Sequence, residues 1–270
     1  MWVRPPAVAG MFYEATAPRL RRQVEECLPR EASSAKKRFI GVVSPHAGLM
    51  YSGPVAGALY ANLELPRRFV ILCPNHTGLG AEASINLEGA WRTPLGDVPI
   101  DAALAHAIRN EAPFVRDDQL AHAREHALEV QLPFLQLLAG EFAFVPLCLA
   151  IPTFARTAEL GRAIAAAIRE AGEPVGIIAS SDLNHYESQE ITLRKDGAAI
   201  EQILRLDPEG LWRTIHERDV SMCGYIPATA MLVAANELGA TEAVLVRHAT
   251  SGDVNRDYSA VVGYASIAVA

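Results

Sequence analysis

Three segments of the chain share one pattern of apolar and polar positions. Each is an apolar run, over residues 39–44, 69–73 or 175–179, that stops at a polar turn carrying a histidine, namely His46, His76 or His185. Runs rich in Val, Ile and Leu are typical of strands that are buried on both faces in a parallel sheet. Ligand sites of such sheets lie just beyond the carboxyl ends of the strands, so the pattern aims three imidazoles at one crevice.

The remaining segments alternate between helical and strand-like periodicity. Helices are expected over residues 17–28, 52–63, 101–110, 125–138, 155–171, 193–205, 208–217 and 227–237, and further strands over residues 84–87, 142–149, 244–247 and 261–268. We expect residues 31–37 to form a polar loop, residues 91–98 a turn-rich connection, and Pro133 to kink its helix. The pattern predicts a single α/β domain over residues 1–270, with a central mostly parallel or mixed β-sheet covered by helices on both faces.

The composition of the chain argues against some classes of binding partner and indicates its cellular compartment. The chain has 24 Lys and Arg against 31 Asp and Glu, a net charge of −7, so it lacks the basic field that nonspecific nucleic-acid binding needs. Its four cysteines lie far apart with no C-x-x-C pair, which argues against a disulfide framework or a zinc knuckle and favours a reducing compartment. No signal-peptide profile is visible, and no apolar run approaches the roughly 18 residues of a membrane span. We therefore expect a cytoplasmic protein with neither a nucleic-acid nor a membrane partner.

His46 and His76 follow their strands in similar turns. The turns read Pro-His-Ala-Gly and Pro-Asn-His-Thr-Gly, and the glycines allow a sharp exit close to a ligand. Imidazole nitrogens at the mouths of adjacent strands would suit iron, zinc or copper. A histidine that only hydrogen-bonds its own turn is the alternative, and it is weaker for two such residues than for one.

Other polar residues lie in comparable positions. Asp182 and His185 follow the third strand and could act together as an oriented acid and base, or Asp182 could simply cap a helix. Cys223 stands just before an expected helix, whose positive end would lower the thiol pKa and favour a metal-binding thiolate. A small buried apolar role for Cys223 is equally open. His126 and Glu129, one helical turn apart, could add a further acid or base, or form only a solvated helix face.

Several ordered motifs together resemble the Memo family, also known as protein B of the AmmeMemoRadiSam system. The resemblance runs nearly end to end. It is carried by RPPAVAGMFY at residues 4–13, SPHAGLMYSG at 44–53, PNHTG at 74–78, EHALEVQLPF at 125–134, SSDLNHY at 180–186, CG at 223–224 and SGD at 251–253.

The resemblance implies a fold like that of the class III extradiol ring-cleaving dioxygenases, which hold non-haem iron between two histidines and a carboxylate. Carried onto this chain, it implies a metal at His46, His76 and Cys223, with Asp182, His185 and His126 as catalytic candidates. Iron is the favoured metal, with copper or zinc as alternatives. Cys223 stands where the dioxygenases use a carboxylate, and a thiolate changes the redox potential, so ring cleavage is not simply inherited.

Three functions are consistent with these residues. The first is a redox or dioxygenase-like reaction on a small molecule. The second is a non-catalytic scaffold that binds a peptide or small ligand, because Memo proteins are also assigned such roles. The third is a metal-dependent hydrolase using bound water. The resemblance also implies a functional link to radical-SAM and AMMECR-type proteins.

Overall fold

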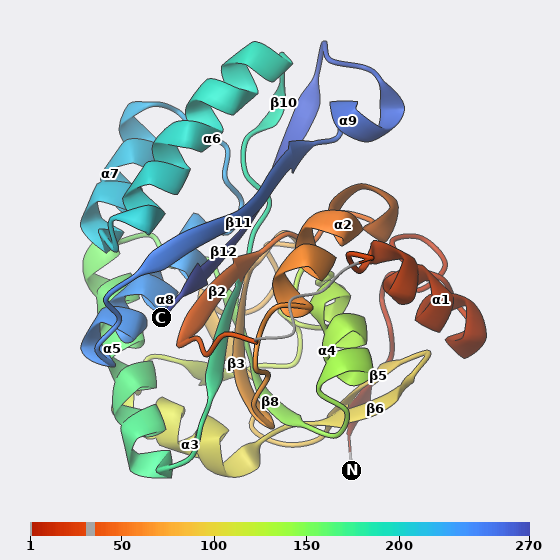
Figure 1. Cartoon of the computed structure of the whole chain (residues 1–270). Coiled ribbons are helices and arrows are strands. Elements are labelled where there is room, and N and C mark those ends of the chain that lie inside the picture. The colour runs from red at the N-terminus through yellow and green to blue at the C-terminus, as the bar shows by residue number, and fades with distance from the viewer. Residues whose placement is uncertain (1, 31–35) are drawn as a thin grey trace.

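A large mixed β-sheet forms the centre of the molecule (Figure 1). The computed structural model describes residues 2–30 and 36–270, so most of the expected polar loop at 31–37 lies outside the described residues. The strands are β1 Val3–Arg4, β2 Gly41–Ser44, β3 Arg68–Pro74, β4 Ala83–Ile85, β5 Ala90–Thr93, β6 Gly96–Pro99, β7 Arg116–Asp117, β8 Ala143–Leu149, β9 Gly176–Ser180, β10 His185–Glu187, β11 Ala243–Thr250 and β12 Val261–Val269.

Helices cover both faces of this sheet. They are α1 Ala17–Cys27, α2 Leu49–Tyr60, α3 Ala102–Glu111, α4 Leu132–Leu138, α5 Phe154–Ala171, α6 Gln189–Leu204, α7 Pro208–Glu217, α8 Tyr225–Glu237 and the short α9 Gly252–Asn255, with a 3-10 turn at Glu129–Gln131. In Figure 1, α1, α2 and α4 lie to the right of the sheet and α3, α5, α6 and α7 to its left. No helix within residues 2–30 and 36–270 has the length and apolar character needed to span a bilayer.

The order of the strands brings three chain segments to one edge. Within the described residues the main sheet has the order β10-β12-β2-β9-β3-β8-β4-β7, and β11 pairs with β12. Strands β2, β9, β3 and β8 run parallel to one another, whereas β12 runs antiparallel to β2 and β4 antiparallel to β8. Strand β9 therefore lies between β2 and β3, and the carboxyl ends of these three strands meet at one edge.

Burial explains why the apolar runs form the central strands. Every residue of β2 and β9 is buried, and so is every residue of β3 and β8 beyond the first. A strand covered by helices on both faces gains from apolar residues at successive positions rather than at alternate ones. The predicted α/β fold with a mixed, mostly parallel sheet is confirmed, with the core on both faces of the sheet.

Two local predictions are wrong. Residues 91–98 form a hairpin of β5 and β6 rather than a loose connection, because Trp91 is fully buried and Arg92 pairs across the strands with Asp97. Helix α2 begins at Leu49, before the expected start, so Pro54 lies inside it. A backbone hydrogen bond of 2.8 Å from the N–H of Leu49 to the carbonyl of Phe12 fixes this earlier start, which the local sequence does not reveal.

The predicted helix over residues 125–138 is also shorter than expected. Regular helix begins only at Leu132, after the 3-10 turn. Pro133 lies in the first turn of α4, where its missing N–H breaks no helical hydrogen bond, so it does not kink the helix. Residues 125–128 instead form a turn in which the Glu125 carboxylate accepts a hydrogen bond from the N–H of Ala127.

Candidate metal centre

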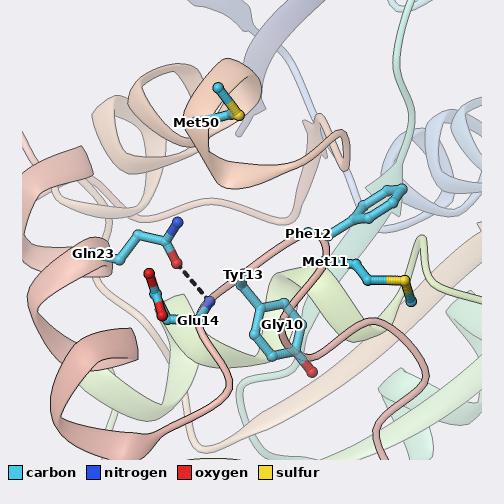
Figure 2. A pocket seen from close by; sticks show the side chains of 7 residues that line it. All are labelled: Gly10, Met11, Phe12, Tyr13, Glu14, Gln23 and Met50. Atoms are coloured by element: carbon cyan, nitrogen blue, oxygen red, sulfur yellow. Dashed lines mark hydrogen bonds between the residues drawn. The ribbon is translucent and has the colours of Figure 1, made fainter.

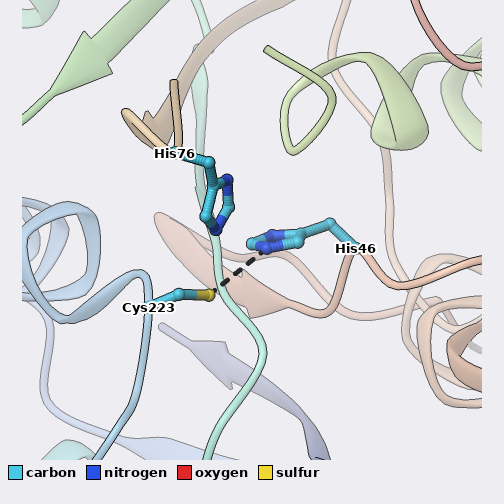
Figure 3. Close-up of side chains that lie close together, drawn as sticks. All are labelled: His46, His76 and Cys223. Atoms are coloured by element: carbon cyan, nitrogen blue, oxygen red, sulfur yellow. Dashed lines mark hydrogen bonds between the residues drawn. The ribbon is translucent and has the colours of Figure 1, made fainter. Parts of the chain in front are cut away.

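The three residues predicted as metal ligands come together at the carboxyl edge of the sheet (Figure 3). His46 follows β2, His76 follows β3, and Cys223 lies in the segment between α7 and α8. Their ligand atoms all lie within 4.8 Å of one another. The Sγ of Cys223 is 3.3 Å from Nε2 of His46. A cluster of two imidazoles and one thiol at these separations is able to hold a metal ion.

Hydrogen bonds behind His46 determine which ring nitrogen is free. The Ser180 hydroxyl donates to the carbonyl of Ala127 at 2.6 Å, so its proton is already used. Its oxygen therefore accepts from Nδ1–H of His46 at 2.9 Å and from the Gln131 amide at 2.8 Å. Because Nδ1 of His46 carries the proton, Nε2 presents a lone pair towards Cys223.

Glu125 has the same effect on His76. Its carboxylate accepts from Nδ1 of His76 at 2.9 Å and from the backbone N–H of the same residue at 2.7 Å. A carboxylate can only accept, so the proton is on Nδ1 and the lone pair is on Nε2. Burial alone would raise the pKa of Glu125, but hydrogen bonds from His76 and Ala127 outweigh it and hold the pKa below its usual value.

Glycine at position 224 allows Cys223 to reach the other ligands. A Cβ atom on Gly224 would lie 2.4 Å from the carbonyl oxygen of Ser180, so a larger residue could not pack there. The N–H of Gly224 also donates to the Ser181 hydroxyl at 2.9 Å. This close approach ties the start of α8 to the end of β9 and places the thiol beside His46.

The thiol is not activated as the sequence predicts. Burial, and after it the negative charge of Asp182, raises the pKa of Cys223 above its ordinary value. The positive end of α8 does not outweigh these effects. Burial, together with the neighbouring imidazoles of His126, His76 and His185, holds the pKa of His46 well below its ordinary value. In the metal-free protein the neutral forms of His46 and Cys223 are therefore favoured.

Asp182 and His185 do not form the direct pair that was considered for them. Oδ1 of Asp182 accepts from the N–H of His46 at 2.8 Å and from the N–H of Ala47 at 3.3 Å. Burial raises the pKa of Asp182 to about 6 despite these hydrogen bonds. Nδ1 of His185 donates to the carbonyl of Ser221 at 2.9 Å, which leaves Nε2 as an acceptor. Both residues nevertheless line the same cavity.

His126 also lies at this cavity, but not on a helix face with Glu129. Its ring stacks on that of His76 with centroids 4.7 Å apart and packs against Phe12 at the same distance. Glu129 points elsewhere and forms a buried ion pair with Arg4. Glu125, Gln131 and Ser180 orient the ligands, although no local sequence pattern marks them for this role. The motif at 125–134 contains two of them, but only the folded turn shows what they contact.

The candidate ligands face a cavity of about 570 Å³. Its wall also includes Phe12, Tyr186 and Tyr264. Phe12 also borders a smaller hollow of about 130 Å³ near Glu14 and Gln23 (Figure 2). In that view the Phe12 ring points away from the Glu14 and Gln23 side chains. Phe12 therefore contributes to the walls of two separate hollows.

Comparison with known proteins agrees with this architecture. The family model described as Memo-like protein matches residues 4–268. A MEMO1 family protein of Methanothermobacter thermautotrophicus is 44% identical over 98% of this chain and 99% of its own length. Another, from Pyrobaculum aerophilum, is 45% identical over 99% of each chain.

A solved structure supports the fold independently of these relatives. An uncharacterized protein from Escherichia coli superposes with a TM-score of 0.53 at 17% identity, covering 85% of this chain and 99% of that one. At this identity the likeness concerns the fold alone. The family match and the full-length relatives carry the assignment: the chain belongs to the Memo-like protein family.

Proposed function

We propose that this chain binds a redox-active divalent metal, iron, through Nε2 of His46, Nε2 of His76 and Sγ of Cys223, and uses it in an oxygenase-like or related redox reaction on a small molecule. The observation that carries the proposal is the orientation of the two histidines. Ser180 and Glu125 each hold the Nδ1 proton of one ring, so both free lone pairs point into the cluster. A histidine that only stabilises a turn needs no such arrangement.

The number of ligands and the adjacent cavity favour a catalytic metal over a structural one. A structural zinc site is usually closed by four protein ligands, whereas this cluster offers three and opens onto a cavity. Imidazole with thiolate suits iron or copper as well as zinc. When bound, the metal would supply a Lewis acid and a redox centre for a substrate held in the cavity.

The surrounding side chains would bind and orient the substrate and move protons. Nε2 of His185 is free to accept a proton from a substrate, because its Nδ1 is held by the carbonyl of Ser221. Asp182 can accept a hydrogen bond from a substrate and aid its orientation. His126 lies against His76 and Phe12, where it can close one side of the cavity and exclude water.

Metal content and oxygen uptake test the proposal together. After anaerobic purification, elemental analysis should find iron, and oxygen consumption should appear with the correct substrate. Zinc together with ester or amide cleavage would instead support a hydrolase. A protein that takes up no metal but binds a ligand would be a scaffold.

A matched pair of cysteine variants tests the ligand set. Cys223→Ser should lose metal, whereas Cys148→Ser, in a fully buried thiol of β8, should retain it. Equal metal occupancy in wild type and Cys223→Ser would remove Cys223 from the ligand set. Asp182 would then become the candidate third ligand.

A further inference from the structure

The cavity beside the candidate metal ligands has aromatic side chains and a carboxylate in its wall. Phe12, Tyr186 and Tyr264 contribute rings, and Asp182 contributes the carboxylate. Among the described residues that line the cavity, none is Lys or Arg. Substrate carboxylates and phosphates are usually bound by such cations, so this wall lacks the permanent positive charge that an anionic substrate would favour.

One oxygen of Asp182 is available to a ligand. Oδ1 already accepts from the backbone of His46 and Ala47. No donor within the described residues contacts Oδ2, although the side chain is only 4% exposed and lines the cavity. A ligand in the cavity that donates to Oδ2 would form a charge-assisted hydrogen bond with this carboxylate.

Tyr186 is held at the mouth of the cavity by an irregular strand. Strand β10 pairs with β12 through His185 and Glu187, and the register shifts between them, so Tyr186 lies in a β-bulge. Its φ is 60°, in the left-handed region that non-glycine residues seldom adopt, and its side chain is 77% exposed. Bulges often re-aim a side chain next to a functional site, and strain of this kind is common there. The bulge therefore fixes the backbone at Tyr186, and the phenol ring lines the cavity with most of its surface uncovered.

We propose that the cavity binds a small organic cation, an amine whose ammonium group donates to Oδ2 of Asp182 while its carbon skeleton lies against the rings of Phe12 and Tyr186. Aromatic faces attract a cation, and a buried carboxylate adds a charge-assisted hydrogen bond. The inference rests on the proposed function in one respect: the amine would be the substrate of the metal chemistry.

Three probes of nearly the same shape test the charge preference: benzylammonium, benzyl alcohol and benzoate. Each is titrated calorimetrically into the chelator-treated protein, so that no probe binds through a metal, and then into the protein as purified. In the metal-free protein we expect benzylammonium to bind at least roughly tenfold more tightly than benzyl alcohol, with benzoate weakest. Equal binding of all three, stronger binding of benzoate, or no binding of benzylammonium at millimolar concentration would overturn the proposal.

Two substitutions locate the binding. Asp182→Asn should weaken benzylammonium roughly tenfold but change benzyl alcohol less than about twofold, because only the charge is lost. Tyr186→Leu should weaken benzylammonium while Tyr186→Phe restores it, since the ring face and not the hydroxyl makes the contact. Unchanged benzylammonium binding in both Asp182→Asn and Tyr186→Leu would contradict the proposed position. Metal content is measured separately, so a failure of the metal proposal is distinguishable from a failure of this one.

Discussion

The molecule contains two clusters of polar side chains that differ in how their hydrogen-bonding groups are used. In the first, Arg4 and Glu129 are both fully buried and form an ion pair. Glu129 also accepts from the N–H groups of Ala7 and Val8 and from the Tyr13 hydroxyl. The Arg4 guanidinium donates to three backbone carbonyls and lies 4.0 Å from the centre of the Trp91 ring.

In the second cluster, the protein leaves selected groups free. His46 and His76 each have one nitrogen held from behind and one lone pair turned towards Cys223. Oδ2 of Asp182 likewise has no donor among the described residues. The first cluster connects the N-terminal segment to the turn before α4. The second cluster leaves atoms available to bind a metal or another ligand. Polar atoms that lack a partner within the protein, rather than polarity or burial as such, distinguish a ligand site from a structural cluster.

Because the first cluster is fully paired and buried, we predict the largest loss of stability for a substitution at Glu129. Glu129→Ala leaves the Arg4 charge buried without its partner, so the free energy of unfolding should fall by about 3–5 kcal/mol. Urea denaturation measures this. Glu64→Ala is the control, because it breaks the exposed pair with Arg38 and should cost at most about 1 kcal/mol. If the two variants were equally stable, the buried ion pair of Arg4 and Glu129 would not be important for the stability of the fold.

Glu125 is fully buried and orients His76 at the candidate metal site. Glu125→Gln keeps the shape of the side chain but weakens its hold on Nδ1 of His76. We expect metal affinity to fall roughly 10- to 100-fold in a chelator competition assay. Its thermal midpoint should change much less than that of Glu129→Ala. The exposed Glu88→Gln provides a control, and unchanged affinity in Glu125→Gln would show that Glu125 does not orient the ligand.

His122 lies beside the first cluster and is its exception. Its carbonyl accepts from Arg4, but neither ring nitrogen has a partner among the described residues. Burial, and after it the charge of Arg4, lowers the pKa of His122 to about 3. An unfolded chain binds this proton near pH 6.5, so the neutral folded form is stable above that pH and loses stability as the pH falls.

Between pH 7 and pH 5 this one residue should cost the folded state about 2 kcal/mol. His122→Leu should remove most of that loss, measured as the difference between unfolding free energies at the two pH values. The exposed His106→Gln should leave the difference unchanged. A wild-type pH dependence in His122→Leu would contradict the assignment.

The smallest predicted effect is an increase in stability from a substitution at Tyr186. Tyr186→Gly removes a side chain from a backbone position with φ of 60°, so stability should rise by about 1 kcal/mol while benzylammonium binding weakens. Asp219→Gly is the matched control, since Asp219 has a φ of 49° but does not line the cavity. It should gain similar stability with no change in binding. A loss of stability in Tyr186→Gly would show that the bulge is not strained.

The candidate metal ligands could be predicted from the sequence, whereas the residues that orient their side chains could not. Apolar runs ending in His46 and His76 follow directly from strand burial, and a parallel sheet brings their ends together. Glu125 and Ser180 could not be recognised in the same way, because their roles depend on which atoms face them after folding. The hairpin at 91–98 and the start of α2 were missed for a related reason. Strand β5 pairs with β1, and Leu49 bonds to Phe12, so contacts distant in sequence override the local pattern.

The position of β9 between β2 and β3 has a consequence for how the protein matures. His46 and His76 are both synthesised early, yet the strands that carry them become neighbours of a common strand only after residues 176–180 have been added. Cys223 is added later still. Such long-range pairing is slow to form, and a nascent chain cannot assemble the site piece by piece. We therefore expect the candidate metal site to stay incomplete in the ribosome-bound chain until nearly the whole sheet has emerged, so that any metal would bind only late in synthesis.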